Sequence, residues 1–156
     1  MKALIEPINI SFKTFTQSDI QSVLAIENLS FESPWSEKKF IDSLKNEQVL
    51  ANLILQNKQI LGYGIVQFCS DSADLLNICI HPKQQNLGLG KALFSYMQKG
   101  LQRIGVNDIF LEVRQSNQAA EGFYQALGFE QINLRKNYYT NGEDAKIMRI
   151  SFNNKI

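Results

Sequence analysis

The sequence predicts an α/β protein with a mixed sheet, in which an antiparallel first half joins a parallel strand–helix–strand unit. Residues 49–55 and 60–68 are strand-like and flank the short polar link 57–59, which is typical of a hairpin and therefore of antiparallel pairing. Residues 74–80 and 109–113 are also strand-like, and a long amphipathic segment separates them. Two strands joined by a helix are expected to pair in parallel.

The N-terminal region predicts one strand and two helices. Residues 8–15 form the strand, and Thr16 with Asp19 three positions later has the spacing of a capping box for a helix that runs to about residue 29. A break at residues 31–35 follows. Ser36 can cap the second helix, in which Phe40 and Leu44 lie four residues apart.

The later elements are predicted from glycines, caps and periodicity. Gly62 and Gly64 inside their strand indicate a bulge or a close backbone approach. The long helix that follows the loop at residues 83–90 ends at Gly105, and its apolar positions have helical spacing: Leu93, Met97, Leu101 and Ile104. Asn117 can cap the next helix, which Gly128 closes. Two final strands are expected at residues 129–132 and 145–152.

Length and composition exclude several classes of protein. At 156 residues the chain has the size of one ordinary domain, so residues 1–156 are expected to form a single domain. The 16 Lys and Arg against 15 Asp and Glu give a net charge of +1, which argues against nucleic-acid or membrane-surface binding. No run of 18 apolar residues is present, so no membrane-spanning helix is expected.

The rare residues narrow the chemistry further. There are two cysteines, Cys69 and Cys79, and one histidine, His81, which are too few for a four-ligand structural zinc site. No metal is therefore expected, and any Ser-His or Cys-His nucleophile pair would have to use His81. Without a partner motif, His81 is interpreted as a surface or loop residue. Two cysteines do not make a disulfide framework, which fits the reducing cytoplasm, the expected location.

A glycine-containing loop between a strand and a long helix is the first candidate site. Glycines let backbone N–H groups approach a ligand, and the helix N-terminus adds partial positive charge, so the loop favours phosphate or pyrophosphate. A dinucleotide fingerprint would need glycine where Leu93 stands, and a P-loop would need Ser or Thr where Ala92 stands. An ordinary strand-to-helix turn is the alternative. The run comprises Gln85, Asn86, Leu87, Gly88, Leu89, Gly90 and Lys91.

Several motifs together carry a family resemblance. Gln85-x-x-Gly88-x-Gly90 after a strand resembles the coenzyme A pyrophosphate loop of the GCN5-related N-acetyltransferases, and the element order matches that fold over nearly the whole chain. Further segments resemble the bacterial ribosomal-protein alanine N-acetyltransferases (the RimI type) within that superfamily. These are Pro34-Trp35-Ser36-Glu37-Lys38, Leu111-Glu112-Val113-Arg114-x-Ser116-Asn117-x-Ala119-Ala120, Tyr124-x-x-Leu127-Gly128-Phe129, Arg135-x-x-Tyr138-Tyr139, Glu143-Asp144-Ala145 and Met148.

The resemblance implies acetyl transfer from acetyl-CoA to the N-terminal amine of a protein, with the alanine of small-subunit ribosomal protein eighteen as the acceptor. It implies Glu112 as the general base, acting directly or through water, and Tyr124 as the acid that protonates the coenzyme thiolate. The backbone of Ile78, Cys79 and Ile80 would bind the pantetheine and thioester. The loop at residues 85–91, Asn117 and Tyr124 would contact the coenzyme, and Trp35, Tyr138 and Tyr139 the peptide.

The residues by themselves leave other interpretations open. Side chains alternate along a strand, so Glu112 shares a face with Phe110 and Arg114. It is there either a solvated residue at the rim or a base whose pKa is raised by apolar surroundings. Tyr124 can be a packed core residue, Asn117 a helix cap, and Trp35, Tyr138 and Tyr139 core aromatics. A lysine or small-amine acetyltransferase, or a non-catalytic coenzyme A-binding module, remain alternatives.

Two further points concern the coenzyme loop and a cysteine. Relatives often carry a basic residue where Asn86 stands and a polar one at Leu87, so coenzyme affinity can differ here. A covalent acetyl-cysteine at Cys79 is a minor alternative to direct transfer. The sequence does not indicate the oligomeric state.

Overall fold

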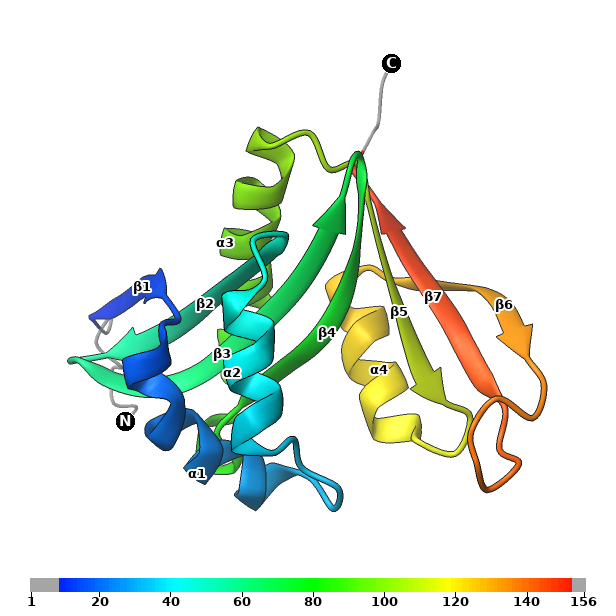
Figure 1. The fold of residues 1–156 in the computed structure, drawn as a ribbon, viewed down its shortest axis with the longest axis horizontal. Helices are drawn as coiled ribbons and strands as arrows, with labels where there is room; N and C mark the ends of the chain where they lie inside the picture. The colour runs from blue at the N-terminus through cyan, green and yellow to red at the C-terminus, as the bar shows by residue number, and fades with distance from the viewer. Residues whose placement is uncertain (1–8, 153–156) are drawn as a thin grey trace, which may run out of the picture.

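One seven-stranded mixed sheet runs through the computed structural model, which describes residues 9–152 (Figure 1). Its order is β1-β2-β3-β4-β5-β7-β6, and the pairing is antiparallel everywhere except between β4 and β5. The predicted α/β class with a mixed sheet is confirmed. The strands are β1 (Ile10–Thr14), β2 (Val49–Gln56), β3 (Gln59–Cys69), β4 (Ser72–Ile80), β5 (Asp108–Arg114), β6 (Glu130–Arg135) and β7 (Ala145–Ser151).

The helices cover the two faces of the sheet and enclose two cores. α1 (Ile20–Ser30) and α2 (Glu37–Lys45) pack on one face, where Phe40 and Tyr63 are fully buried. In Figure 1 these two helices lie in front of β2 to β4. α3 (Leu89–Arg103) and α4 (Gln118–Leu127) share the other core, which contains Met97 and Phe129.

The predicted caps explain where most helices begin and end. The Ser36 hydroxyl accepts from the Lys39 N–H at 3.1 Å. Gly105 and Gly128 follow α3 and α4 with φ of +93° and +113°, the left-handed conformation that suits glycine. α1 starts later than expected, at Ile20, because a 3-10 turn at Gln17–Asp19 precedes it.

The boundaries and order of the C-terminal strands differ from the prediction. β6 begins at Glu130 and extends to Arg135, while Phe129 before it is buried in the core. β7 lies between β5 and β6, so the last strand of the chain separates two strands that precede it. Sequence order does not reveal this insertion, because it depends on pairing across the sheet. Residue 8, the expected start of the first strand, lies outside the described residues.

Gly62 and Gly64 mark the close approach that the sequence indicated. The register of β2 and β3 shifts between Ile54 and Leu55, opposite Gly62. A Cβ at Gly62 would lie 2.6 Å from the Cys79 carbonyl oxygen, and a Cβ at Gly64 would lie 2.5 Å from Met97 Sδ. Both glycines therefore bring neighbouring elements closer than any larger residue would allow.

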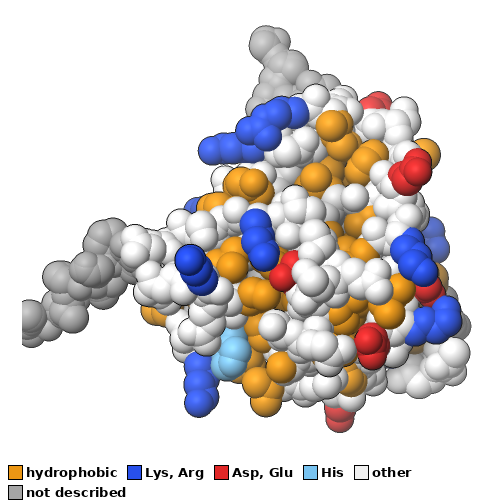
Figure 2. Space-filling view, turned by 60° about the vertical axis from the view of Figure 1, so that its left-hand side comes forward, with side chains coloured by type: hydrophobic (Ala, Val, Ile, Leu, Met, Phe, Trp, Pro, Cys, Tyr) orange, Lys and Arg blue, Asp and Glu red, His pale blue; other side chains and the backbone are white. Residues whose placement is uncertain are grey.

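Charge is dispersed over the face that Figure 2 displays. Lys and Arg side chains lie at separate places around it, and hydrophobic side chains reach the surface between them. This distribution accords with a nearly neutral chain of net charge +1. Within residues 9–152, no helix has both the length and the apolar character needed to span a membrane.

We expect Gly62→Ala to lower the free energy of unfolding by roughly 1–3 kcal/mol, because overpacking against a backbone carbonyl forces the strands apart. The matched control is Gly122→Ala in α4, where a Cβ would meet nothing within 4 Å. That control should gain up to about 1 kcal/mol, because alanine is the better helix former. Urea unfolding measures both changes, and equal stability of the two variants would contradict the assigned close approach.

Candidate active site

β4 and β5 pair over only a short stretch and then diverge. Residues 72–74 are in register with residues 108–110, and beyond them the strands separate, as Figure 1 shows. Over residues 75–80 the edge of β4 that faces β5 has no strand partner among the described residues. Backbone groups on such an edge need hydrogen-bonding partners from elsewhere, such as water or a ligand. The split is therefore a candidate binding site.

The three β4 residues predicted to bind the thioester do not face the same way. The carbonyl of Cys79 points toward β3, since it lies 2.6 Å from the Cβ position of Gly62. The carbonyl of Ile80 points the other way and accepts from the Gln85 side-chain amide at 3.1 Å. Backbone groups alternate along a strand, so Ile78 and Ile80 present theirs to the split. The Cys79 backbone therefore faces β3 rather than the split, and its coenzyme contact stays a prediction.

The loop before α3 presents an open helix N-terminus. Asn86 and Gly88 have φ of +65° and +83°, and a Cβ at Gly88 would meet nothing within 4 Å. Gly88 is the N-cap of α3, and no described side chain caps that helix. The first-turn N–H groups, together with the exposed Lys91, are therefore available to an anion. Leu87 is exposed beside them.

Gly90 and Gln85 have structural roles that the motif did not distinguish. Gly90 is buried, and a Cβ there would lie 2.7 Å from the Phe123 ring. Its missing side chain therefore lets α3 pack against α4. Leu89 is half-buried against the same core. Gln85 ties the loop to the end of β4 through its bond to Ile80.

Glu112 lies on β5 at the exposed rim of the sheet. Its Oε2 accepts from the Tyr138 hydroxyl at 3.1 Å, and this hydrogen bond raises the pKa of Tyr138. Desolvation and then the charge of Glu112 raise the pKa of Asp74, which lies where β4 leaves β5. Its side chain is exposed, which fits the solvated rim position that was one of the two interpretations of Glu112.

Tyr124 is the partly buried phenol of the site. It packs between Phe123 and Phe129, with ring centroids 5.6 and 6.1 Å away. Burial, and then the nearby Cys79 and Tyr139, raise its pKa to about 12. Tyr124 therefore keeps its proton at neutral pH, as a hydrogen-bond donor must. Tyr124 thus packs against the core, as one interpretation of the sequence held, and also lies near Cys79 of β4, as a role in the site requires.

Cys79 has the surroundings of an inert thiol. Its side chain is buried, and desolvation raises its pKa. A thiol nucleophile needs the thiolate form, which this environment disfavours. The structure thus weakens the covalent acetyl-cysteine alternative.

The loop between β6 and β7 brings both predicted tyrosines to Glu112. Tyr138 and Tyr139 meet edge to face at 5.1 Å, and the Arg114 guanidinium lies 3.9 Å over the Tyr139 ring. Desolvation, followed by the charge of Glu112, raises the pKa of Tyr139. Glu143 anchors the loop by accepting from the Ser116 N–H at 2.7 Å.

Asn117 has the capping role that the sequence allowed. Its Oδ1 accepts from the Ala120 N–H at 3.1 Å at the start of α4. No described residue takes a hydrogen bond from its side-chain NH₂ group, so that group is free for a ligand. His81 caps a short turn in a similar way, because its Nδ1 accepts from the Lys83 N–H at 3.0 Å.

Trp35 packs at the edge of the core beneath α1 and α2. Its ring lies 5.0 Å from Phe40 and beneath the Lys39 ammonium at 4.4 Å. Its backbone N–H donates to Glu27 Oε2 at 2.9 Å. Sequence reasoning missed Glu27, although it follows Ile20 and Val23 at helical spacing on the apolar side of α1. An acidic residue on a buried stripe was the available signal.

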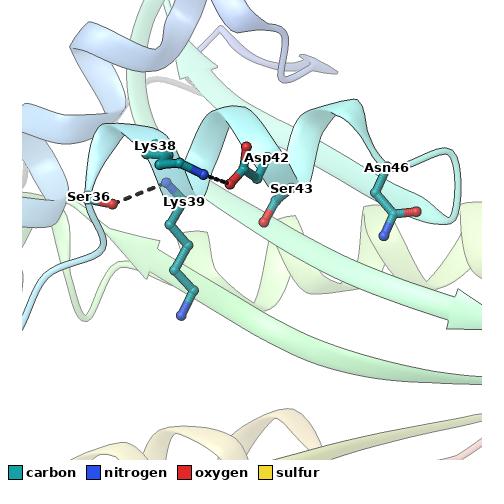
Figure 3. A pocket seen from close by; sticks show the side chains of 6 residues that line it. All are labelled: Ser36, Lys38, Lys39, Asp42, Ser43 and Asn46. Carbon is teal, nitrogen blue, oxygen red and sulfur yellow. Dashed lines mark hydrogen bonds and ion pairs between the residues drawn. The ribbon is translucent and has the colours of Figure 1, made fainter.

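A shallow surface hollow on α2 lies apart from these residues. Figure 3 shows its lining, in which Lys38 pairs with Asp42 at 2.7 Å and the Ser36 hydroxyl caps the helix. Its remaining lining residues are Lys39, Ser43 and Asn46. None of the residues predicted for catalysis or coenzyme binding lines it.

Comparison with known proteins defines the class. Residues 20–129 match the model of the acetyltransferase (GNAT) family. The chain is 39% identical over 136 residues to the [ribosomal protein bS18]-alanine N-acetyltransferase of Escherichia coli K12, covering 85% of this chain and 91% of that protein. It is 38% identical over 124 residues to the enzyme of the same description from Haemophilus influenzae, covering 78% and 82%.

A solved structure agrees with the sequence relatives. The crystal structure of the Escherichia coli ribosomal-protein-S18-alanine N-acetyltransferase superposes with a TM-score of 0.83 at 35% identity, covering 94% of this chain and 96% of that one. Fold and site thus define an N-acetyltransferase. The chain belongs to the GNAT family, and the resemblance inferred from its motifs is confirmed.

Glu143, which anchors the β6–β7 loop, leads to a prediction of how stability depends on pH. Hydrogen bonds from Ser116 and then the Arg114 charge lower the pKa of Glu143. A lowered folded-state pKa gives stability that is present above the unfolded value of about 4.3 and is lost as pH falls through the folded value. We expect Glu143→Gln to destabilise the protein at neutral pH, and the difference from wild type to shrink in acid.

Urea unfolding of both proteins from neutral to acidic pH measures this difference. Glu130→Gln is the control, because Glu130 is exposed and its side chain bonds to no other described residue. A pH-independent difference between wild type and Glu143→Gln would contradict the anchoring role.

Proposed function

We propose that the protein transfers the acetyl group of acetyl-CoA directly to the N-terminal α-amine of a protein. The proposed acceptor is the N-terminal alanine of ribosomal protein bS18, acetylated in the cytoplasm. One observation carries this proposal: the split between β4 and β5 has a partly buried, protonated phenol beside it and an exposed carboxylate at its rim. The printed activity of the bacterial relatives supports the choice of acceptor.

The residues around the split fit a nucleotide thioester. The uncapped N-terminus of α3 behind Gly88 suits the pyrophosphate, with Lys91 adding positive charge. The free edge of β4 at Ile78 and Ile80 suits the amides of the pantetheine arm, in the manner of an added strand. The side-chain NH₂ of Asn117 offers one further donor to the coenzyme.

Glu112 removes the proton that blocks attack by the amine. An α-amine has a pKa of about 7.7–8.0, so part of it is already neutral near pH 7 to 8. A carboxylate that acts directly or through water needs to deprotonate only the amines that are still cationic. The neutral amine then forms the C–N bond while the C–S bond breaks. Backbone N–H groups at Ile78 and Ile80 would stabilise the negative charge that develops on the carbonyl oxygen.

Tyr124 supplies a proton to the departing thiolate. Its raised pKa keeps the proton on the phenol, so that the hydroxyl can donate to the sulfur as negative charge develops there. A thiolate of cysteine-like pKa, about 8.5, accepts that proton only if the two atoms are within hydrogen-bonding distance. The nitrogen of the new C–N bond loses a proton as the amide forms, and this proton restores the phenol through solvent.

Tyr138 and Tyr139 are proposed to hold the acceptor peptide. The hydrogen bond from Tyr138 to Glu112 shows that this loop reaches the proposed base. An incoming amine would replace or share that bond, and Tyr139, fixed by Arg114, would form a wall beside it. Trp35 is proposed to contact the peptide from the opposite side, as part of the loop between α1 and α2.

We expect Glu112→Gln and Tyr124→Phe each to lower kcat by about 10²-fold or more, because each removes a proton-transfer group. Both should keep the wild-type melting temperature to within a few degrees. Cys79→Ala is the control and should keep most of the activity. Release of free thiol from acetyl-CoA plus peptide measures the rates. Near-wild-type turnover of both variants would overturn the assigned roles.

The acceptor class needs a separate experiment, because a lysine side chain or a small amine would fit the same coenzyme site. Two peptides that begin with alanine and contain one lysine are used, one with a free and one with a blocked α-amine. Each is incubated with acetyl-CoA, and its intact mass is measured by mass spectrometry. We expect a single acetyl group on the free-amine peptide only. Acetylation of the blocked peptide would show a lysine acetyltransferase, and thiol release from neither would indicate a coenzyme A-binding module.

A further inference from the structure

Glu27 is a buried carboxylate that the proposed chemistry does not use. Its side chain lies on α1, and the residue is 1% exposed. Oε1 accepts from the Tyr63 hydroxyl and from Asn77 Nδ2 at 3.0 Å, and Oε2 accepts from the Trp35 backbone N–H at 2.9 Å. Burying a carboxylate is costly unless its oxygens are hydrogen-bonded, and these three donors offset that cost.

The three donors come from three different parts of the chain. Tyr63 lies on β3, Asn77 on β4 directly before Ile78, and Trp35 in the loop between α1 and α2. Among the hydrogen bonds of the described residues, the bond from Trp35 to Glu27 is the one that holds residues 32–35 of this loop. Glu27 therefore fixes the loop relative to the strand whose free edge faces the split.

The carboxylate is also next to the site. Tyr63, which donates to this carboxylate, is the register partner of Cys79 on β4, and both side chains lie in the same buried core. Cys79 in turn lies near enough to Tyr124 to raise its pKa, after the larger effect of burial. The residues around Glu27 therefore extend to the surroundings of Tyr124, the proposed acid, through Cys79.

We infer that Glu27 is a positioning residue, which holds the Trp35 loop as one wall of the acceptor site and so sets the affinity for the peptide without touching the reacting atoms. The inference rests on the proposed function. A positioning role predicts that loss of Glu27 weakens acceptor binding and leaves coenzyme binding intact, because among the described residues no hydrogen bond joins the pyrophosphate loop or α3 to this carboxylate.

Two variants test the role. Glu27→Asp keeps the charge but shortens the side chain, so it cannot reach Trp35 and the two strand residues together. Glu27→Leu removes every acceptor at similar volume. Tyr63→Phe is the matched control, because it removes one donor from the same carboxylate and leaves the bond to Trp35 in place.

The protein contains one tryptophan, so its fluorescence reports on the Trp35 loop alone. Without any substrate, we expect both Glu27 variants to show red-shifted emission and stronger quenching by acrylamide than wild type. We expect KM for an alanine-initiated peptide to rise by about ten-fold or more, the effect of losing a hydrogen bond to a charged group. The Kd of acetyl-CoA from calorimetry should stay near the wild-type value. Tyr63→Phe should resemble wild type in all three measurements.

Each other result counts against the inference. Unchanged fluorescence and peptide KM in a folded Glu27 variant would show that the loop is held by other contacts. Equal loss of peptide and acetyl-CoA binding, or unfolding of both Glu27 variants but not of Tyr63→Phe, would show a purely structural role. If wild type acetylates no peptide, the proposed function fails, whereas the fluorescence comparison still decides whether Glu27 positions the loop.

Discussion

The short parallel contact between β4 and β5 is the constraint on which the rest of the structure depends. The two strands are in register over residues 72–74 and 108–110 and then separate. Had they stayed paired, the backbone of Ile78 and Ile80 would be bonded within the sheet and no ligand could use it. The separation leaves those groups free, and it places Glu112 and Tyr124 on the far side of the gap. The candidate active site is therefore a gap within the sheet rather than a pocket beside it.

Close packing of α3 keeps that gap in a fixed shape. Gly64 lets Met97 approach the sheet, and Gly90 lets Phe123 of α4 approach α3. Of the two glycines in the loop motif, Gly88 faces open space at a positive φ and so has the conformation and clearance expected of a residue that cradles an anion. Two glycines separated by one residue in a single motif thus serve different purposes, one for packing and one for access to the ligand.

Much of the fold and of the candidate site could be predicted, and the errors share one cause. Caps such as Ser36 and Asn117 and the glycine after each long helix act locally, so the sequence placed them correctly. The orientation of the Cys79 backbone toward β3, the exposure of Glu112 and the position of β7 in the sheet all depend on which element lies alongside. Glu27 escaped notice because its three donors are 8, 36 and 50 residues away in sequence.

By itself, the sequence determined the fold class, the helix ends, the family and the residue types able to transfer protons, because these follow from local periodicity and from motifs. Only the tertiary structure decided which backbone groups of β4 are free, that Tyr138 reaches Glu112, and that a buried carboxylate joins the Trp35 loop to the sheet. Hydrogen bonds between distant segments set these features. Their partners are chosen by how the strands diverge and the helices pack, which no local pattern of residues encodes.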